Sequence, residues 1–266
     1  MVKIKVIHIF DIAGVSSIIA HTMDKKFGTE SIVITNRDPW GVTTYGRVLN
    51  KHPIVFWFIV LYETRKYDII HLNFHTQFAW LFKLFYPKKP LIIHYHGSEI
   101  RKKWDTKRDW RHANYVYVST KDLLIGAPEH VEYLPNPVDT SLFYPRDLSQ
   151  IPQDSACYFS YDADDVALKL AREHDLCLTI YERNQPHRII PEILSKHKLF
   201  LDIKRVNGVL LYPKGIYSKL ALEALRIGLK VISTNGEITS TFPIEHDTEL
   251  ITQKVYATYK KLLQEI

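Results

Sequence analysis

The sequence predicts an α/β protein built from two Rossmann-like parallel-sheet domains that face a cleft. Short β-branched runs alternate with segments of helical spacing, and Gly and Pro mark the short connections between them. This alternation favours parallel sheets covered by helices on both faces. The chain has 266 residues, which is more than one compact core usually holds. We therefore expect two such domains.

The first half of the chain predicts six strands and four helices in alternation. The first strand stops at a glycine turn ending in Gly14, and a proline or glycine closes several later segments. The expected strands are 2–10, 31–35, 67–72, 91–96, 115–118 and 131–134, and the expected helices are 16–23, 54–66, 78–85 and 121–125.

A second alternation follows a polar, proline-containing segment at 147–154, which we take as the domain boundary. It predicts an N-terminal domain at 1–148 and a C-terminal domain at 149–266. Packing of the last helix, about 248–264, back toward the N-terminal domain is an open alternative. The expected strands are 156–159, 176–180, 199–203, 209–211 and 230–233, and the expected helices are 166–173, 189–194, 218–227 and 248–264.

Composition excludes several classes of protein. With 46% hydrophobic and 24% charged residues the chain is an ordinary globular one. Two cysteines are too few for a disulfide framework, so a cytoplasmic location is expected. The longest apolar run, 54–62, is far shorter than the roughly 20 residues of a membrane-spanning helix. The 35 Lys+Arg and 29 Asp+Glu give a net charge of +6, and the basic excess lies before residue 150.

The segment 215–232 carries the clearest candidate for ligand chemistry. Ser218 is placed to cap a helix, and free N–H groups at a helix N-terminus bind anions such as a diphosphate. Glu223 follows on the same helix, where a carboxylate accepts two hydrogen bonds from a diol such as a ribose. A solvated Glu223 is the structural alternative, although its neighbours on the helix are apolar.

These residues belong to an ordered series of motifs. Glu223-Ala224 and Gly228 precede the apolar strand 229–232, and 67–71 precedes the histidine loop 94–101 (HYHGSEIR). The longest motif is 134–145 (LPNPVDTSLFYP). The series resembles the retaining GT-B glycosyltransferases of the group 1 type over nearly the whole chain. The resemblance implies transfer of a sugar, of hexosyltransferase type, from a nucleotide-diphosphate sugar to a hydroxyl acceptor that is a glycan or lipid-linked. It makes 1–148 the acceptor-side domain and 149–266 the nucleotide-sugar-binding domain.

The resemblance also implies roles for single residues. Gly14 matches a glycine loop that admits donor phosphate and acceptor, and His96 matches the histidine that contacts the transferred sugar. Around His96, the loop residues Gly97, Ser98 and Glu99 are expected to bind substrate. Glu223 matches the glutamate that binds the ribose, and Ser218, Lys219 and Tyr217 are expected beside the donor. No cofactor other than the nucleotide-sugar substrate is implied.

The other histidines of this half, His71, His75 and His94, are expected to be packed core residues. They lie on different strands without a short ligand spacing, so we expect no metal site.

Two departures from the family pattern favour a rival function. Gly215 stands where the family has a first glutamate, and the acidic segment 162–165 stands where the family has bases. Arg183 and Lys204 are candidates to replace the missing positive charge. The rival is a non-catalytic nucleotide-sugar or glycan-binding relative, and a sugar epimerase on the same scaffold is a third hypothesis.

A basic loop with two tryptophans, 101–111, follows the His96 loop. Bases interleaved with aromatic residues suit an anionic membrane surface, which attracts each base by about 1 kcal/mol. The docking candidates are Arg101, Lys102, Lys103, Lys107 and Arg108. The aromatic segment 78–85 is expected to pack on the sheet instead. A membrane-peripheral location is therefore an alternative, whereas nucleic acid is not expected as a partner because no recognition motif accompanies the charge.

Overall fold

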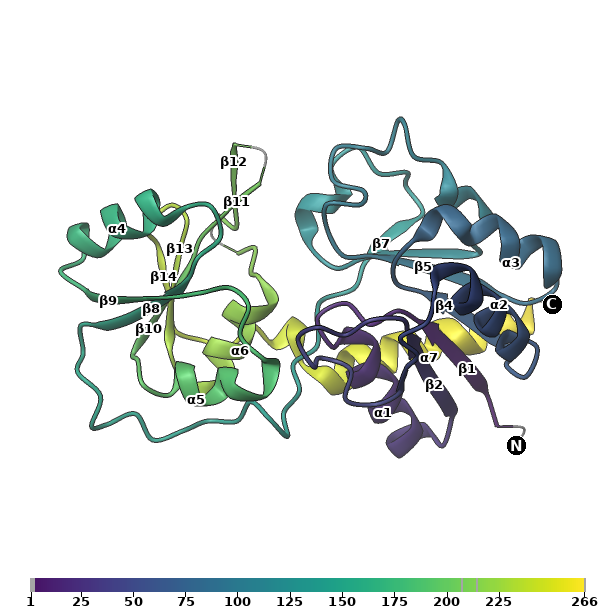
Figure 1. The fold of residues 1–266 in the computed structure, drawn as a ribbon, viewed down its shortest axis with the longest axis horizontal. Helices are drawn as coiled ribbons and strands as arrows, with labels where there is room; N and C mark the ends of the chain where they lie inside the picture. The colour runs from purple at the N-terminus through teal and green to yellow at the C-terminus, as the bar shows by residue number, and fades with distance from the viewer. Residues whose placement is uncertain (1–2, 207, 214, 266) are drawn as a thin grey trace. The chain divides into compact units, whose positions relative to one another are not determined.

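The computed structural model describes residues 3–206, 208–213 and 215–265, and these form two compact units (Figure 1). Unit 1 comprises Met1–Pro137 and Asp247–Ile266, and unit 2 comprises Val138–His246. The polar segment at 147–154 lies inside unit 2, because Val138, Phe143 and Leu148 belong to that unit's core.

Unit 1 is built on a parallel seven-stranded sheet of order β3-β2-β1-β4-β5-β6-β7. The strand order reverses between β1 and β4, and in such sheets ligands bind beyond the carboxyl ends of the strands at this reversal. The strands are β1 (Lys5–Ile9), β2 (Glu30–Thr35), β3 (Arg47–Val48), β4 (Ile69–Leu72), β5 (Leu91–Tyr95), β6 (Tyr115–Val118) and β7 (Val131–Tyr133).

Helices cover both faces of this sheet (Figure 1). On one face α2 (Pro53–Thr64) and α3 (Ala79–Phe85) bury Phe56 and Phe82 against the strands. On the other face α1 (Val15–Phe27) and α7 (Thr248–Gln264) do the same with Met23 and Tyr259. Short 3-10 helices at Thr76–Phe78, Asp109–His112 and Lys121–Leu124 complete the unit.

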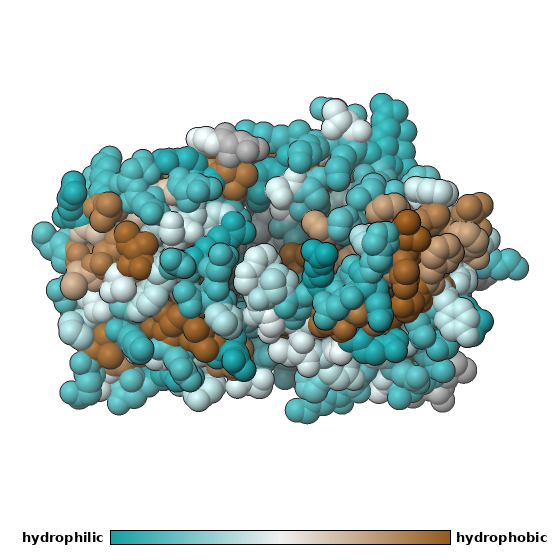
Figure 2. Space-filling model, in the orientation of Figure 1, coloured by the Kyte–Doolittle hydropathy of each residue, from teal (hydrophilic) through white to brown (hydrophobic). Residues whose placement is uncertain are grey.

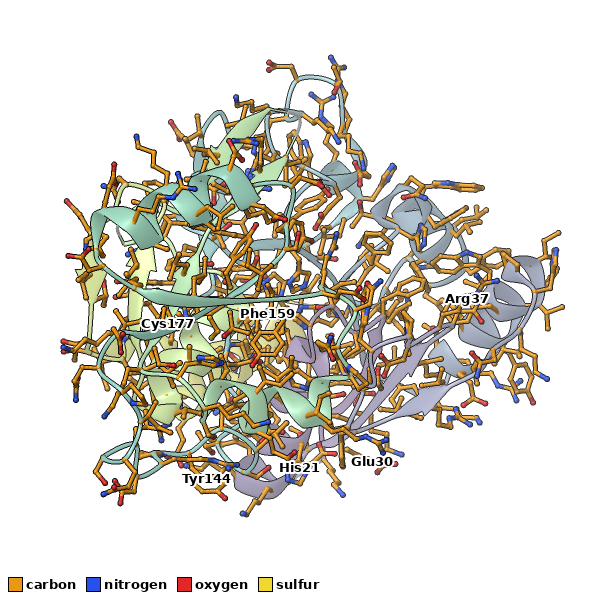
Figure 3. The ribbon with its side chains drawn as sticks, turned by 60° about the vertical axis from the view of Figure 1, so that its left-hand side comes forward. His21, Glu30, Arg37, Tyr144, Phe159 and Cys177 are labelled. Atoms are coloured by element: carbon orange, nitrogen blue, oxygen red, sulfur yellow. The ribbon has the colours of Figure 1, made fainter. Side chains whose placement is uncertain are left out.

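Unit 2 has a five-stranded sheet of order β14-β13-β10-β8-β9, in which only β14 runs antiparallel. Helices α5 and α6 pack on one face and α4 on the other. The elements are β8 (Ser155–Phe159), α4 (Asp164–Glu173), β9 (Cys177–Tyr181), α5 (Ile190–Leu194), β10 (Leu199–Asp202), α6 (Lys219–Ile227), β13 (Lys230–Ser233), β14 (Ile238–Thr239) and 3-10 helices at His187–Ile189 and Ile244–His246. Figure 3 labels Phe159 and Cys177, the last residue of β8 and the first of β9.

The α/β class with Rossmann-like parallel sheets is confirmed. The sequence missed the short strands β3, β11 (Lys204–Val206) and β14, and β11 forms a hairpin with β12 (Val209–Leu211). These strands have two or three residues, none of them buried, so they carry no run of apolar residues. Among the described residues, no helix is both long and apolar enough to cross a membrane.

Candidate functional site

The glycine loop of unit 1 is a tight turn between β1 and α1. Gly14 has a φ of 75°, and a Cβ on it would lie 3.2 Å from the Val42 carbonyl oxygen. Asp11 accepts hydrogen bonds from the Ser16 and Ser17 backbone N–H groups at 2.9 and 3.4 Å. Burial raises the pKa of Asp11 to about 6. The loop therefore carries a desolvated carboxyl group at the carboxyl end of β1.

His96 follows β5 and is held by its own loop. Its backbone N–H donates to Glu99 Oε1, and its Nε2 lies 3.4 Å from Asn73 Oδ1 in the loop after β4. Burial lowers the pKa of His96 to about 4, against the opposing charge of Glu99. The imidazole is therefore neutral at pH 7 and directs an N–H toward Asn73, a residue that the sequence analysis did not single out.

Gly97 lies beside Glu99, and a Cβ on it would make ordinary contact with Arg101 Nη1 at 3.6 Å and Glu99 Oε2 at 3.9 Å. The Gly97 carbonyl accepts the Ile100 and Arg101 N–H groups, and the Ser98 carbonyl accepts Lys103 Nζ at 2.6 Å. Gly97, Ser98 and Glu99 thus shape the loop through their backbone and through the Glu99 carboxylate. Their expected contact with substrate stays a prediction.

Behind His96, three fully buried histidines form a row across the sheet. The ring centroids of His8 and His71 lie 4.9 Å apart, those of His71 and His94 5.7 Å, and those of His94 and His96 4.2 Å. His71 Nδ1 shares a 2.6 Å hydrogen bond with the Tyr259 hydroxyl of α7. His71 and His94 are core residues, as expected.

His75 was also expected in the core, and that prediction was wrong. Its side chain is exposed and lines a cavity, because its backbone takes a left-handed conformation (φ 51°) that turns the chain out of the strand direction after β4.

That cavity lies at the carboxyl ends of β1, β2 and β4 and holds about 1000 Å³. Its floor and walls come from the loop after β1, the segment after β2, and the helices α2 and α3. Most of its lining is apolar and aromatic. The aromatic side chains are Phe10, Trp40, Phe56, Trp57, Phe58, Phe74, Phe78 and Phe85.

In unit 2 the candidate donor site is the start of α6. The Ser218 hydroxyl caps the helix by accepting the Ala221 N–H at 3.1 Å, and the Ser218 N–H donates to Asp202 Oδ2 at 2.9 Å. Asp202 ends β10 and is buried, which raises its pKa to about 6. This contact fixes the helix start at the carboxyl edge of the sheet.

Glu223 is buried on α6 and is not solvated. Its Oε1 accepts from His187 Nε2 at 3.0 Å and lies 3.4 Å from Lys219 Nζ. His187 stacks near Phe143, whose ring centroid is 5.3 Å away. The sequence analysis missed His187, since no local spacing connects it with a glutamate 36 residues further on.

The bases expected to replace the family's missing charge gather around one ring. Arg183 and Lys204 each place their charged group 3.8 Å from the centroid of Tyr161. The acidic segment is partly neutralised, because Arg205 pairs with Asp165 at 2.8 Å. Tyr217 places its hydroxyl 3.3 Å from Thr239 Oγ1. Gly215 is exposed with a φ of 80° and open space around it.

The basic loop presents its bases without its tryptophans. Trp104 is buried with its indole N–H on the Leu123 carbonyl, and Trp110 donates to the Lys107 carbonyl. Arg101 pairs with Asp122 at 2.6 Å. Lys102, Lys103 and Arg108 are exposed.

Exposed apolar side chains lie elsewhere on unit 1, on α2 and α3. Figure 2 shows hydrophobic residues gathered over the part of unit 1 where Figure 1 places these helices. The expectation that segment 78–85 packs on the sheet holds for Ala79 and Phe82 but not for Trp80, Leu84 and Phe85, because a helix covers a sheet with one face only.

No group of three or more His, Cys, Asp or Glu side chains in the described part of the chain is arranged to hold a metal ion.

The chain matches no protein-family model. It also matches no curated protein sequence. Solved structures do resemble it. Sucrose-phosphate synthase from Thermosynechococcus elongatus superposes with a TM-score of 0.59 at 13% identity, covering 99% of this chain and 100% of that one.

Two other resemblances are of similar extent. An alpha-glucosyltransferase solved with UDP and a 13-mer DNA has a TM-score of 0.57 at 12% identity, covering 99% of this chain and 92% of that one. UDP-GlcNAc 2-epimerase from Methanocaldococcus jannaschii has a TM-score of 0.52 at 9% identity, covering 96% and 100%. The DNA in one of these structures leaves the expectation of no nucleic-acid partner without support. The resemblances show that the chain has the GT-B fold.

Proposed function

We propose that the protein is a glycosyltransferase that moves a hexosyl group from a nucleotide-diphosphate sugar to a hydroxyl of a glycan or lipid-linked acceptor. The observation that carries the proposal is the buried Glu223 carboxylate on α6, one and a half turns after a capped helix start. Two of the three structural neighbours described above are an alpha-glucosyltransferase solved with UDP and a UDP-GlcNAc 2-epimerase, and their likeness to this chain supports the same class of donor.

The donor would bind to unit 2 through three kinds of contact. The free N–H groups at the start of α6 would donate hydrogen bonds to the diphosphate, and Lys219, Arg183 and Lys204 would supply positive charge. The Glu223 carboxylate accepts the two ribose hydroxyls. It already carries one N–H from His187 and an ammonium from Lys219, so its lone pairs are oriented before the nucleotide arrives.

The reaction would proceed with retention, with the acceptor hydroxyl attacking from the face that the diphosphate leaves. Charge on the departing diphosphate is stabilised by the helix N-terminus and the nearby bases, so no side chain has to act as a strong nucleophile. His96 is neutral and its Nε2–H is directed at Asn73, so its Nδ1 would accept a hydrogen bond from a sugar hydroxyl and orient it without adding charge. The proposal requires no metal and no cofactor other than the donor.

Gly215 favours a second candidate, a relative that binds nucleotide sugars or glycans without catalysis. An exposed glycine provides no carboxylate where the family pattern has one. A sugar epimerase is a further candidate on the same fold.

Nucleotide binding followed by product analysis tests the proposal. We expect UDP, GDP or ADP to raise the melting temperature of the full chain, and Glu223→Gln to weaken that nucleotide about 10- to 100-fold, which corresponds to a charge-assisted hydrogen bond. The matched control is Glu192→Gln, an exposed glutamate of α5 that leaves binding unchanged.

Incubation with the nucleotide sugar then separates the candidates. Release of nucleotide supports the transferase, provided that His96→Ala slows release and leaves nucleotide affinity intact. Binding without release indicates the non-catalytic relative, and conversion of the sugar without an acceptor indicates the epimerase. Absence of any nucleotide binding contradicts the transferase and the epimerase and leaves only a relative that binds glycans.

We also propose a cytoplasmic enzyme that docks on anionic membranes through the exposed bases Lys102, Lys103 and Arg108. At about 1 kcal/mol per base, replacing all three by Glu abolishes flotation with vesicles containing phosphatidylserine. Flotation that changes neither with added salt nor with these substitutions contradicts the proposed docking.

A further inference from the structure

The cavity of unit 1 is larger and more apolar than a sugar requires. Its volume of about 1000 Å³ lies at the upper end of the range for small-molecule sites, which are lined mainly by apolar side chains with a few polar groups. The polar lining is confined to the segments after β1, β2 and β4, whereas α2 and α3 contribute only apolar side chains. The cavity therefore has a polar end and an apolar wall.

The apolar wall continues outward into water. Three side chains that line the cavity remain largely exposed, with Phe58 at 68%, Ile54 at 62% and Phe85 at 58% of their surface accessible. Ile54 and Phe58 are four residues apart on α2, so they lie on one helix face. Contiguous exposed apolar surface of this kind marks a binding site, because single scattered residues would not share one cavity.

The polar end of the cavity carries two carboxylates and one guanidinium. Its carboxylates are already occupied by backbone N–H groups, since Asp11 accepts from Ser16 and Ser17, and Asp38 accepts from Val42 and Thr43 at 3.0 and 2.7 Å.

Arg37, labelled in Figure 3, lies on the same segment, and its exposed guanidinium has no ion-pair partner within residues 3–206, 208–213 and 215–265. A guanidinium is suited to bidentate recognition of a carboxylate or phosphate.

We propose that this cavity binds one long apolar chain of an anionic amphiphile, with its charged head on Arg37. Aromatic rings pack along the chain, and Ile54, Phe58 and Phe85 cover the part that emerges. That this amphiphile is the sugar acceptor rests on the proposed function, whereas binding of the chain does not.

Tryptophan fluorescence provides a direct test, because Trp40 and Trp57 line the cavity and the other three tryptophans do not. We expect a bromine-terminated dodecanoic acid, below its micelle concentration, to quench the full chain saturably, and unbrominated dodecanoic acid to reverse the quenching. In the Trp40→Phe/Trp57→Phe variant the quenching disappears. Quenching that is absent or does not saturate overturns the proposal, and so does quenching that persists in this variant.

Two matched double variants distinguish binding in the cavity from non-specific binding to exposed apolar surface. Phe58→Asp/Phe85→Asp places two charges on the cavity wall and should weaken binding at least about tenfold. Val55→Asp/Leu84→Asp places two charges at exposed apolar positions of the same helices that do not line the cavity, and should leave binding within about threefold. Equal weakening by both pairs overturns the proposal.

The charged head is tested with a neutral probe. Arg37→Gln should weaken the brominated acid about tenfold and leave the matching brominated alcohol unchanged, as expected for loss of a charge-assisted contact. No change for the acid overturns the anionic specificity. Failure of the proposed function is separate, because it appears as loss of nucleotide binding to unit 2 while quenching in unit 1 persists.

Discussion

The histidine row of unit 1, which consists of His8, His71, His94 and His96, is buried in a way that opposes protonation of each imidazole. Burial lowers the pKa of His8 and His96 to about 4 and those of His71 and His94 well below the ordinary value of 6.5. Each positive charge in the row would also repel its neighbours. Around the row, the Tyr259 hydroxyl of α7 hydrogen-bonds His71, and the Tyr117 ring of β6 packs against His94. Asp24 and Glu99 provide opposing negative charge.

We expect the free energy of unfolding of unit 1 to fall as the pH is lowered from about 6.5 toward 4. In this window the unfolded chain binds protons at these histidines and the folded chain does not, so each histidine removes up to about 1.4 kcal/mol of stability per pH unit. Asp11, with its pKa raised to about 6, acts in the opposite direction and offsets one histidine below that pH.

Urea unfolding followed by tryptophan fluorescence measures this slope for unit 1 alone, since all five tryptophans lie there. His8→Leu should reduce the slope by about one proton, and the exposed His112→Leu should leave it unchanged. A slope that His8→Leu does not alter would contradict this account.

At the scale of elements, α1 offers a comparison between its two ends. It begins after Gly14 and ends before Gly28, and both glycines have left-handed backbones with φ of 75° and 65°. A Cβ on Gly14 would crowd the Val42 carbonyl, whereas a Cβ on Gly28 would meet nothing within 4 Å.

Gly28→Ala should therefore cost about 1 kcal/mol of unfolding free energy from its backbone conformation alone. Gly14→Ala should cost about 1–2 kcal/mol more, because the loop at 38–43 must also move. Chemical denaturation of the two variants measures the difference in unfolding free energy. Equal losses would show that the loop around Val42 moves without loss of stability.

The sequence predicted those elements whose side chains are buried. Runs such as 91–95 are mostly apolar and fully buried, so their composition reports their environment directly. The two-residue strand β3 is exposed on both residues and is set by pairing with β2, a contact that no local pattern encodes.

Residues of the candidate site were predictable only where a motif in one continuous segment of the sequence contains them. Gly14, His96 and Glu223 stand in recognisable local motifs, whereas the partners His187 and Asn73 reach them through tertiary structure.

The aromatic cavity had a signal that was overlooked. Segment 54–62 is apolar all round, and a helix on one face of a sheet buries only one side. Its other side therefore leaves apolar side chains exposed, and some of these line the cavity.

At the scale of the whole molecule, the chain leaves unit 1 after Pro137 and returns at Asp247. Both core clusters of unit 2 consist only of its own residues. In unit 1, by contrast, Val6 and Ile69 lie in one cluster with Ile251 and Val255 of α7.

We expect a fragment of residues 138–246 to fold alone. A fragment of residues 1–137 should show no cooperative unfolding, whereas a third fragment, in which a short linker joins 1–137 to 247–266, should unfold cooperatively. Circular dichroism and urea titration of the three fragments check this. Cooperative unfolding of 1–137 by itself would show that α7 is dispensable.

The same chain path sets an order of events during synthesis. The ribosome completes the sheet of unit 1 long before it makes α7. The apolar surface that α7 covers beside α1 therefore stays exposed to water while the whole of unit 2 is translated. Unit 2 is free to fold first. High temperature or a shortage of chaperones should therefore cause most misfolding of the nascent protein during that interval, while unit 1 still lacks α7.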